Sequence, residues 1–442
     1  MLRDAFYIPS QIGDVALFGP SGLLVWLWLA GCALWLGLAF RRGKQAGQEA
    51  LAQLPMLLIV AAMMVWVMPR MFDLQGRLAV RGFGMAVLAG IVAGGWLAVY
   101  QAKRMGVDPE VIFSLGIWLF VAGFLGARTF YVIQKWPDFQ APTRMEQLWK
   151  ILNFTQGGIV VYGSLIGALV PLLIFPGRYK LPALALCDLV SPAFALGAAL
   201  GRLGCLANGC CFGGECELPW AMEFPVGSPP FIRQVEEGKI PEQTALLGLK
   251  LGGHFAPPVV LDVAKGSYAE RIGLKAGMRI TQVARLPMNA AGDVLAVLFS
   301  LRPGDQVSIQ VADIEKPFLW SIPADAPRSR PVHPTQLYSS INAFLICLVL
   351  LAYYPYRRRD GEVIGILLTI YPVVRFLEEA LRTDERAIGF TSMSISQNVS
   401  VLLLFAMAGY WFALLRLPAH RALPTADGCL TFPKANETST GK

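Results

Sequence analysis

Two arginines are the side chains of this sequence best suited to binding a phosphate. Arg202 stands in GRLGCLANGCCFGGEC, residues 201–216, and Arg375 stands in YPVVRFLEEALRTD, residues 371–384. A planar guanidinium offers paired donors that match two phosphate oxygens. Glu379 follows Arg375 by four residues, so the two share a helix face and can form an ion pair. Either arginine could instead serve structure alone, at a helix end or at the membrane surface.

Two further polar side chains could handle protons. His333 is one of only three histidines and begins HPTQLY. Tyr162 lies in GGIVVYGSLIG, residues 157–167, where the glycine spacing predicts close packing of one helix against another. A lone histidine more often serves structure than catalysis, and Tyr162 would place a phenol among the packed glycines.

Four cysteines, Cys205, Cys210, Cys211 and Cys216, follow Arg202. In an oxidising compartment they predict one or two disulfides that brace a loop. The run holds no C-x₂-C pair and no adjacent histidine, so we expect no metal site there. A thiol that itself takes part in group transfer is a further alternative.

The elements that must position these residues are membrane helices. The 442 residues are 55% hydrophobic and 15% charged, with a mean hydropathy of +0.52, whereas soluble domains carry about 25% charged residues. Because a spanning helix needs roughly 20 apolar residues, the runs predict an all-α polytopic membrane protein with about nine transmembrane helices. They lie near 17–40, 53–68, 82–100, 111–131, 157–175, 183–204, 335–355, 361–376 and 396–416.

Compact clusters of lysine and arginine predict the orientation. They occur in alternate loops, at 41–44, 103–104, 178–180 and 357–359, as is typical of cytoplasmic loops. The N-terminus is then outside and the C-terminus inside, with segment 205–334 on the outer face. The net charge of +8 fits attraction to anionic lipid, and nothing indicates a nucleic-acid partner. The start of the chain lacks the pattern of a cleaved signal peptide.

Segment 205–334 is too long for an ordinary connection and predicts an inserted α/β domain. Strands are expected at 259–263 and 306–311, and short helices at 267–272 and 293–301. This order, with KGSYAERIGLKAGMRI and LRPGDQVSIQV, resembles a PDZ domain of the bacterial periplasmic type over residues 245–324. PDZ domains bind extended peptides at a sheet edge, which implies a peptide-binding turn at Gly248 and Leu249. The alternative is a spacer without a ligand.

Several motifs in order resemble the prolipoprotein diacylglyceryl transferase family. They are VRGFGMAVLAG, GARTFYV, GGxxxxGxLIG, GRxGxxxNGxxxG, HPTQLY, YxxxRFxxExxR and SMSISQNVS. The resemblance implies a membrane core at 77–230 and 331–416, interrupted by the PDZ-like domain. Residues 1–76 are then two extra N-terminal transmembrane helices, and 417–442 a disordered cytoplasmic tail.

The resemblance also implies the chemistry. Members of the family move a diacylglyceryl group from phosphatidylglycerol to the thiol of a lipobox cysteine in a prolipoprotein, at the outer face of the bacterial cytoplasmic (inner) membrane. No cofactor is expected. By resemblance, Arg202 and Arg375 fall on the family's essential arginines, and Asn208 and Glu379 on its signature asparagine and glutamate. The implied catalytic set also includes Tyr162 and His333, and the implied lipid-binding set includes Gly158 and Gly163.

The sequence departs from the family pattern where protons are handled. Tyr162 stands where the family has histidine, and a phenol with a pKa of about 10 is a poor base near neutral pH. Phe83 replaces a tyrosine, Cys205 an asparagine, Cys210 a glutamate and Ser339 a further glutamate. The phosphate-binding residues are therefore those of the family, while the proton-handling residues differ.

Two other functions remain open on these residues. One is a paralogous transferase with another envelope protein as acceptor. The other is a non-catalytic scaffold that binds phospholipid through the arginines and a peptide through the insert. An intramembrane protease is disfavoured, because the sequence has no HExxH motif and no GxSG elbow paired with a histidine on another span.

Overall fold

A computed structural model describes residues 4–423, except 14, 44–46, 49, 52–53, 72–76, 141, 154–157, 159, 180, 242–245, 253–256, 285, 302–304, 313, 324 and 383–392. The chain divides into two compact units. Unit 1 comprises Met1–Met85, Gly204–Cys210 and Glu215–His333, and unit 2 comprises Ala86–Leu203, Cys211–Gly214 and Pro334–Lys442.

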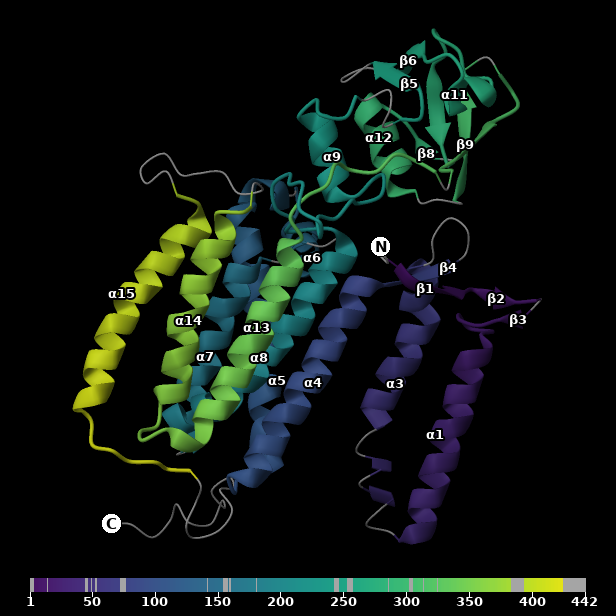
Figure 1. Cartoon of the computed structure of the whole chain (residues 1–442). Helices are drawn as coiled ribbons and strands as arrows, with labels where there is room; N and C mark the ends of the chain where they lie inside the picture. The colour runs from purple at the N-terminus through teal and green to yellow at the C-terminus, as the bar shows by residue number, and fades with distance from the viewer. Residues whose placement is uncertain are drawn as a thin grey trace. The chain divides into compact units, whose positions relative to one another are not determined.

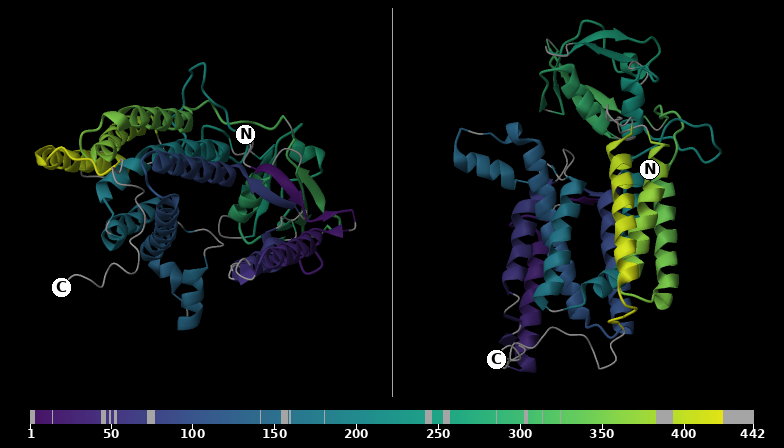
Figure 2. Two further views of the ribbon diagram at one scale, coloured as in Figure 1. Left: turned by 90° about the horizontal axis from the view of Figure 1, so that it is seen from below. Right: turned by 90° about the vertical axis from the view of Figure 1, so that its left-hand side faces the viewer.

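Unit 2 is helical, and its long helices run roughly parallel to one another (Figures 1 and 2). Most of α4 and α8 belongs to it, together with whole helices from both halves of the chain. The helices are α4 (Gly82–Arg104), α5 (Pro109–Gln134), α6 (Arg144–Leu152), α7 (Val161–Tyr179), α8 (Ala183–Asn208), α13 (Thr335–Tyr353), α14 (Glu362–Glu379) and α15 (Ile395–Arg416).

Six helices in the described part of the chain are long and apolar enough to cross a membrane. They are Leu23–Arg42, Gly82–Arg104, Pro109–Gln134, Ala183–Asn208, Thr335–Tyr356 and Ile395–Arg416. A polytopic membrane fold is thus confirmed, but the predicted count of nine is not. The other three runs fall in α3 (Leu54–Ala62), α7 and α14. Helix α3 has only nine residues and continues as a π-helix, Met63–Val67, and α14 carries charged side chains near both ends.

Glycines bring two helix pairs of unit 2 close together. A Cβ on Gly163 of α7 would lie 2.5 Å from the carbonyl oxygen of Gly126 on α5, and one on Gly167 only 2.2 Å from that of Ala122. A Cβ on Gly94 of α4 would lie 2.9 Å from the carbonyl oxygen of Ala193 on α8. Real Cβ atoms do not approach so closely, so the predicted close packing in the 157–167 region is confirmed for Gly163 and Gly167.

Local side chains set where the helices begin. The Asp108 carboxylate accepts a hydrogen bond from the Glu110 amide at 3.0 Å and caps α5, with Pro109 at its first position. Ser394 and Gln397 form a reciprocal capping box at the start of α15. Helix α14 follows Gly361, whose φ of 101° is one that other residues rarely adopt.

Unit 1 begins with two small antiparallel pairs and the helices α1 (Leu23–Arg42) and α3. The pairs are β1 (Asp4–Pro9) with β4 (Arg77–Arg81), and β2 (Gln11–Ile12) with β3 (Val15–Ala16). Helix α1 leaves most of its apolar side chains exposed, with only Val25 buried. An apolar exposed surface of this kind is what a lipid-facing helix requires.

The inserted segment of unit 1 forms an α/β module (Figure 1). A four-stranded antiparallel sheet has the order β10-β9-β7-β8, and β5 pairs with β6. The elements are α9 (Pro229–Glu236), β5 (Leu249–Gly252), β6 (Val259–Val263), α11 (Tyr268–Arg271), β7 (Ile280–Val283), β8 (Leu286–Pro287), α12 (Ala291–Ser300), β9 (Gln306–Val311) and β10 (Phe318–Ser321). The strands predicted at 259–263 and 306–311 are confirmed, and the two short helices lie within about two residues of their predicted bounds.

Alternating side chains explain the core of this module. In β9 the odd positions Val307, Ile309 and Val311 are buried, while the even ones are not. They pack in one apolar cluster with Val260 and Trp320, among others. The period of two along a half-buried strand is what allowed its prediction from sequence.

Candidate functional site

Arg202 of α8 and Arg375 of α14 line one pocket in unit 2. Its volume is about 40 Å³, far below the roughly 300–1,000 Å³ of typical ligand pockets. A headgroup therefore enters only if side chains move apart. The other lining residues are Ala198, Ser339, Asn342, Ala343, Ile346, Tyr371, Val374 and Glu378.

Helical spacing explains how three separate segments supply this lining. Residues three, four or seven apart lie on one helix face. Helix α8 contributes positions 198 and 202, α13 contributes 339, 342, 343 and 346, and α14 contributes 371, 374, 375 and 378. Each helix thus presents a single face to the pocket, polar toward one end and apolar toward the other.

Polar contacts between the helices hold this arrangement. The Ser340 hydroxyl of α13 donates to the Ala199 carbonyl of α8 at 2.9 Å. The Arg375 guanidinium donates to the Ser396 hydroxyl at the start of α15 at 3.0 Å. Both bonds are at least partly buried, where a hydrogen bond is stronger than in water.

Glu379 links the cations at the end of α14. Its carboxylate forms an ion pair with Arg375, as the spacing predicts, and lies 3.8 Å from the Nε atom of Arg382. Only 3% of the Glu379 side chain and 13% of the Arg375 side chain are exposed. Gly214 donates its backbone N–H to the Leu381 carbonyl at 2.9 Å, so the glycines that follow the cysteines border this end of the helix. The pair holds the Arg375 fork in one direction.

Glu378 is a pocket residue that sequence reasoning missed. Its carboxylate accepts from the Ser339 hydroxyl at 2.5 Å and from the Asn342 amide at 2.7 Å. The residue is only 7% exposed. Its spacing of three from Arg375 was the available signal, because that spacing puts both residues on one helix face.

The remaining predicted residues are distributed over the chain. Tyr162 lies at the start of α7, but its side chain is outside the described part of the structure. Gly163 serves the packing of α7 on α5. Asn208 ends α8, and His333 directly precedes the Pro334 that leads into α13. Both belong to unit 1, whereas the pocket residues belong to unit 2.

Gly158 is held by an arginine that sequence reasoning did not single out. Arg128 of α5 donates to the Gly158 carbonyl at 3.1 Å. It also donates to the carbonyls of Lys150, Ile151 and Asn153 at 3.0, 2.8 and 2.7 Å. These carbonyls end α6, where a cation is favourable. Arg128 thereby anchors the connection between α6 and α7, and the motif GARTFYV was its sequence signal.

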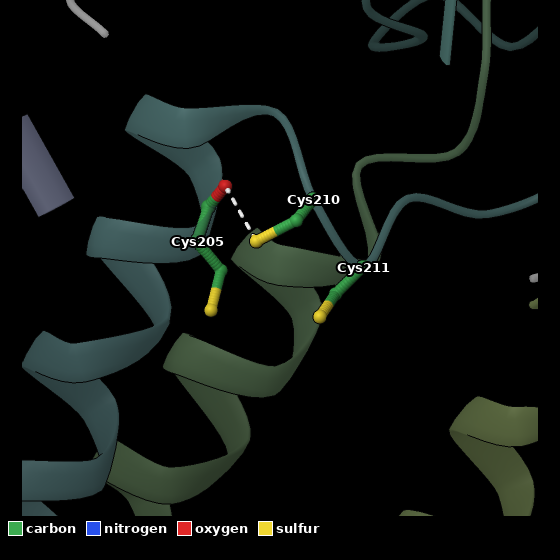
Figure 3. A group of neighbouring side chains, drawn as sticks. All are labelled: Cys205, Cys210 and Cys211. Carbon is green, nitrogen blue, oxygen red and sulfur yellow. Dashed lines mark hydrogen bonds between the residues drawn. The ribbon is translucent and has the colours of Figure 1, made fainter. Parts of the chain in front are cut away.

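The four cysteines predicted to form disulfides, Cys205, Cys210, Cys211 and Cys216, are free thiols in the structure. The Sγ atoms of Cys205 and Cys210 lie within 4.8 Å of each other. The Cys210 thiol donates to the Cys205 carbonyl at 3.7 Å (Figure 3). The Cys211 carbonyl accepts from the Thr335 hydroxyl at 2.6 Å, and the Cys216 amide donates to the Pro331 carbonyl at 3.1 Å. The disulfides remain a prediction.

The turn at Gly248 borders a second pocket, inside the inserted module. Leu247 and Gly248 have φ angles of 53° and 101°, and a Cβ on Gly248 would lie 2.1 Å from that of Ser267. The pocket has a volume of about 360 Å³ and is also lined by residues of α11 and by Pro323, Asp325 and Ala326. Leu249 is buried in β5, and its role in peptide binding stays a prediction.

The geometry in unit 2 suits an anionic headgroup. Two guanidinium groups from different helices line a recess with one carboxylate beside them, and apolar residues continue the recess along the helices. Guanidinium groups bind phosphate oxygens in pairs. The same donors stabilise a phosphate that gains charge as it leaves.

The chain is similar in sequence to known membrane transferases. The family model for prolipoprotein diacylglyceryl transferase matches residues 69–413. A phosphatidylglycerol–prolipoprotein diacylglyceryl transferase of Rhodopirellula baltica is 33% identical over 450 residues, covering 92% of this chain and 88% of that protein. Proteins of the same name from Trichormus variabilis and Deinococcus radiodurans are 35% and 34% identical over 156 and 134 residues. These two matches cover 35% and 30% of this chain, and 53% and 40% of the relatives. The chain belongs to the prolipoprotein diacylglyceryl transferase family.

Proposed function

We propose that this chain transfers the diacylglyceryl group of phosphatidylglycerol to the thiol of a lipobox cysteine in a prolipoprotein. The products are a thioether and glycerol phosphate. The observation that carries the proposal is the placement of Arg202 and Arg375, from two helices, on one recess. A relative that matches 92% of the chain bears the name of this activity.

In this mechanism the two arginines bind the phosphate and stabilise it as it leaves. The thiolate sulfur attacks the terminal glyceryl carbon, a C–S bond forms, and the C–O bond to phosphate breaks. The phosphodiester carries one negative charge and the leaving phosphate monoester carries two. Donors that bind the leaving group more tightly than the substrate lower the barrier. The ion pair with Glu379 keeps Arg375 oriented throughout.

The test is complementation with a chemical readout. Cells depleted of their own transferase receive the chain, and their lipoproteins are analysed for the lipobox thioether. We expect thioether with the natural sequence and none with Arg202→Ala. Arg178→Ala, an exposed arginine at the end of α7, is the matched control and should retain activity.

If the natural chain is made and inserted but yields no thioether, the transferase proposal fails. Phosphatidylglycerol binding that persists in that case, and is lost in Arg202→Ala, would favour the lipid-binding scaffold instead. Thioether on a different envelope protein would favour the paralogous transferase.

The orientation belongs to the same proposal. The basic loops support a cytoplasmic position for 357–359 and an extracytoplasmic position for the insert, at a bacterial inner membrane. A membrane-impermeant maleimide should label a cysteine placed at the exposed Lys265 in intact spheroplasts. Labelling of a cysteine at Arg358 but not at Lys265 would reverse the topology.

A second proposal concerns the inserted module, which we take to be PDZ-like over 245–324. In the described residues β5 pairs only with β6, which leaves one edge for an added strand. The recess beside Leu247 and Gly248 supports a peptide end at this turn. Binding of a synthetic prolipoprotein peptide to the full chain should weaken in Gly248→Ala. Equal binding by that variant would argue for a spacer.

A further inference from the structure

Two adjacent glutamates of α14 have different surroundings. Glu379 is held by the cations Arg375 and Arg382. The hydrogen bonds of Glu378 come from neutral side chains instead, the Ser339 hydroxyl and the Asn342 amide of α13. Glu378 also lines the recess that holds both arginines, and 7% of its surface is exposed. Glu378 is therefore a carboxylate in the recess whose two oxygens are held by uncharged hydrogen-bond donors.

The transfer needs an acceptor for the thiol proton, because the thiolate is the nucleophile. Arg202 and Arg375 cannot accept protons, since guanidinium groups remain charged. The hydroxyl of Ser339 donates to the Glu378 carboxylate at 2.5 Å. Among the residues that line the recess, Glu378 is the one that carries a carboxylate.

We propose that Glu378 takes the proton from the acceptor thiol. This inference rests on the proposed transferase activity. The S–H bond breaks as the proton passes to a Glu378 oxygen, the sulfur forms the C–S bond, and the C–O bond electrons leave with the phosphate. Glu378 then releases its proton to water after the products depart. Ser339 and Asn342 orient the carboxylate.

The test is a pH profile of Glu378→Gln in the full chain, with vesicles containing phosphatidylglycerol and a synthetic lipobox peptide. Loss of a general base typically costs about 10²–10⁴-fold in rate, so we expect kcat at pH 7 to fall at least about 100-fold. The KM for phosphatidylglycerol should change little, because the arginines remain. Without the base, the rate should rise about tenfold per pH unit until the thiol ionises near pH 8.5.

The charge can also be moved between helices. Because Ser339 touches Glu378, the double variant Ser339→Glu with Glu378→Gln returns a carboxylate to the recess from α13. We expect this variant to recover activity at pH 7 and the pH profile of the natural chain. Should Glu378→Gln fail to fold, the double variant carries the test. Glu362→Gln, a buried glutamate at the other end of α14, is the matched control and should keep the natural profile.

Two results would overturn the inference. One is an unchanged pH profile in Glu378→Gln, especially alongside an altered profile in Tyr162→Phe. The other is an equal fractional loss at every pH that Ser339→Glu does not repair, which indicates a structural role. Failure of the transferase proposal is distinct, because it would appear as no thioether from the natural chain or undiminished activity in Arg202→Ala.

Discussion

The two ends of α14 both bury charge, but Asp188 and Arg357 at one end are satisfied differently from Arg375 and Glu378 at the other. At the N-terminal end, the Asp188 carboxylate of α8 accepts from the backbone amides of Gly361 and Ile364, each at 2.8 Å. The Arg357 guanidinium donates to the carbonyls of Tyr354 and Leu423 at 2.9 and 2.7 Å and lies 4.0 Å from the Tyr354 ring centre. At the C-terminal end, charged side chains contact other side chains and line a cavity.

This difference distinguishes charged side chains that stabilise the fold from those available to bind a ligand. A charge satisfied by the backbone is fixed by the fold and has little freedom to exchange its partner for a ligand. A charge held by side chains beside a recess can do so. Buried arginines alone are therefore weak evidence for a site, and their partners decide the question.

The largest effect is expected for Arg375→Ala, at the cavity end. Loss of one donor to a developing anion costs about 10²–10³-fold in rate, so thioether formation should fall by that factor. The thermal unfolding midpoint should also fall, because the buried Glu379 loses a cationic partner, so kcat is compared per folded molecule. An assay of kcat with purified protein checks this, and a large loss of stability with normal kcat would break the comparison.

The next effect is expected for Arg357→Ala, at the backbone-satisfied end. The change leaves two buried carbonyls without their donor, which costs about 1–3 kcal/mol of stability. The unfolding temperature should fall, while kcat per folded molecule stays close to that of the natural chain. A fall in kcat without a fall in stability would show that this end also takes part in the reaction.

A smaller effect is expected for Asp188→Asn. The amide keeps one oxygen for the Gly361 and Ile364 amides but brings an N–H toward one of them, so about 1 kcal/mol should be lost. Thermal unfolding in detergent measures the change. A gain of stability would mean that burying this carboxylate costs more than its two hydrogen bonds return.

The smallest effect is expected for Glu237→Gln, an exposed charge in the inserted module. Arg233 and then Lys239 lower the pKa of Glu237 through hydrogen bonds. Its stabilisation is therefore present above the ordinary glutamate pKa and is lost as the pH falls through the lowered value. Because 37% of the side chain is exposed, solvent screens the pair, and the change at pH 7 should be below about 0.5 kcal/mol. A loss of stability as large as that of Arg357→Ala would contradict the explanation that burial sets the size of these effects.

Local sequence patterns predicted the membrane class, the pairing of Arg375 with Glu379 and two strands of the insert. These features depend on residues close together in the chain: apolar runs, a spacing of four, and alternation along a strand. The ordered Leu423, within the segment predicted to be a disordered tail, was not foreseen, and it is fully buried.

Which residues share the recess depends on how distant helices pack together. Ser339 and Asn342 are 39 and 36 positions from Glu378, and Arg202 is farther still, so no local pattern links them. The tertiary structure also decided that the helical turns after α3 are of the π type, over Met63–Val67. Contacts between distant residues depend on how helices pack, and packing follows from the shapes of whole faces, which the spacing of single residues does not encode.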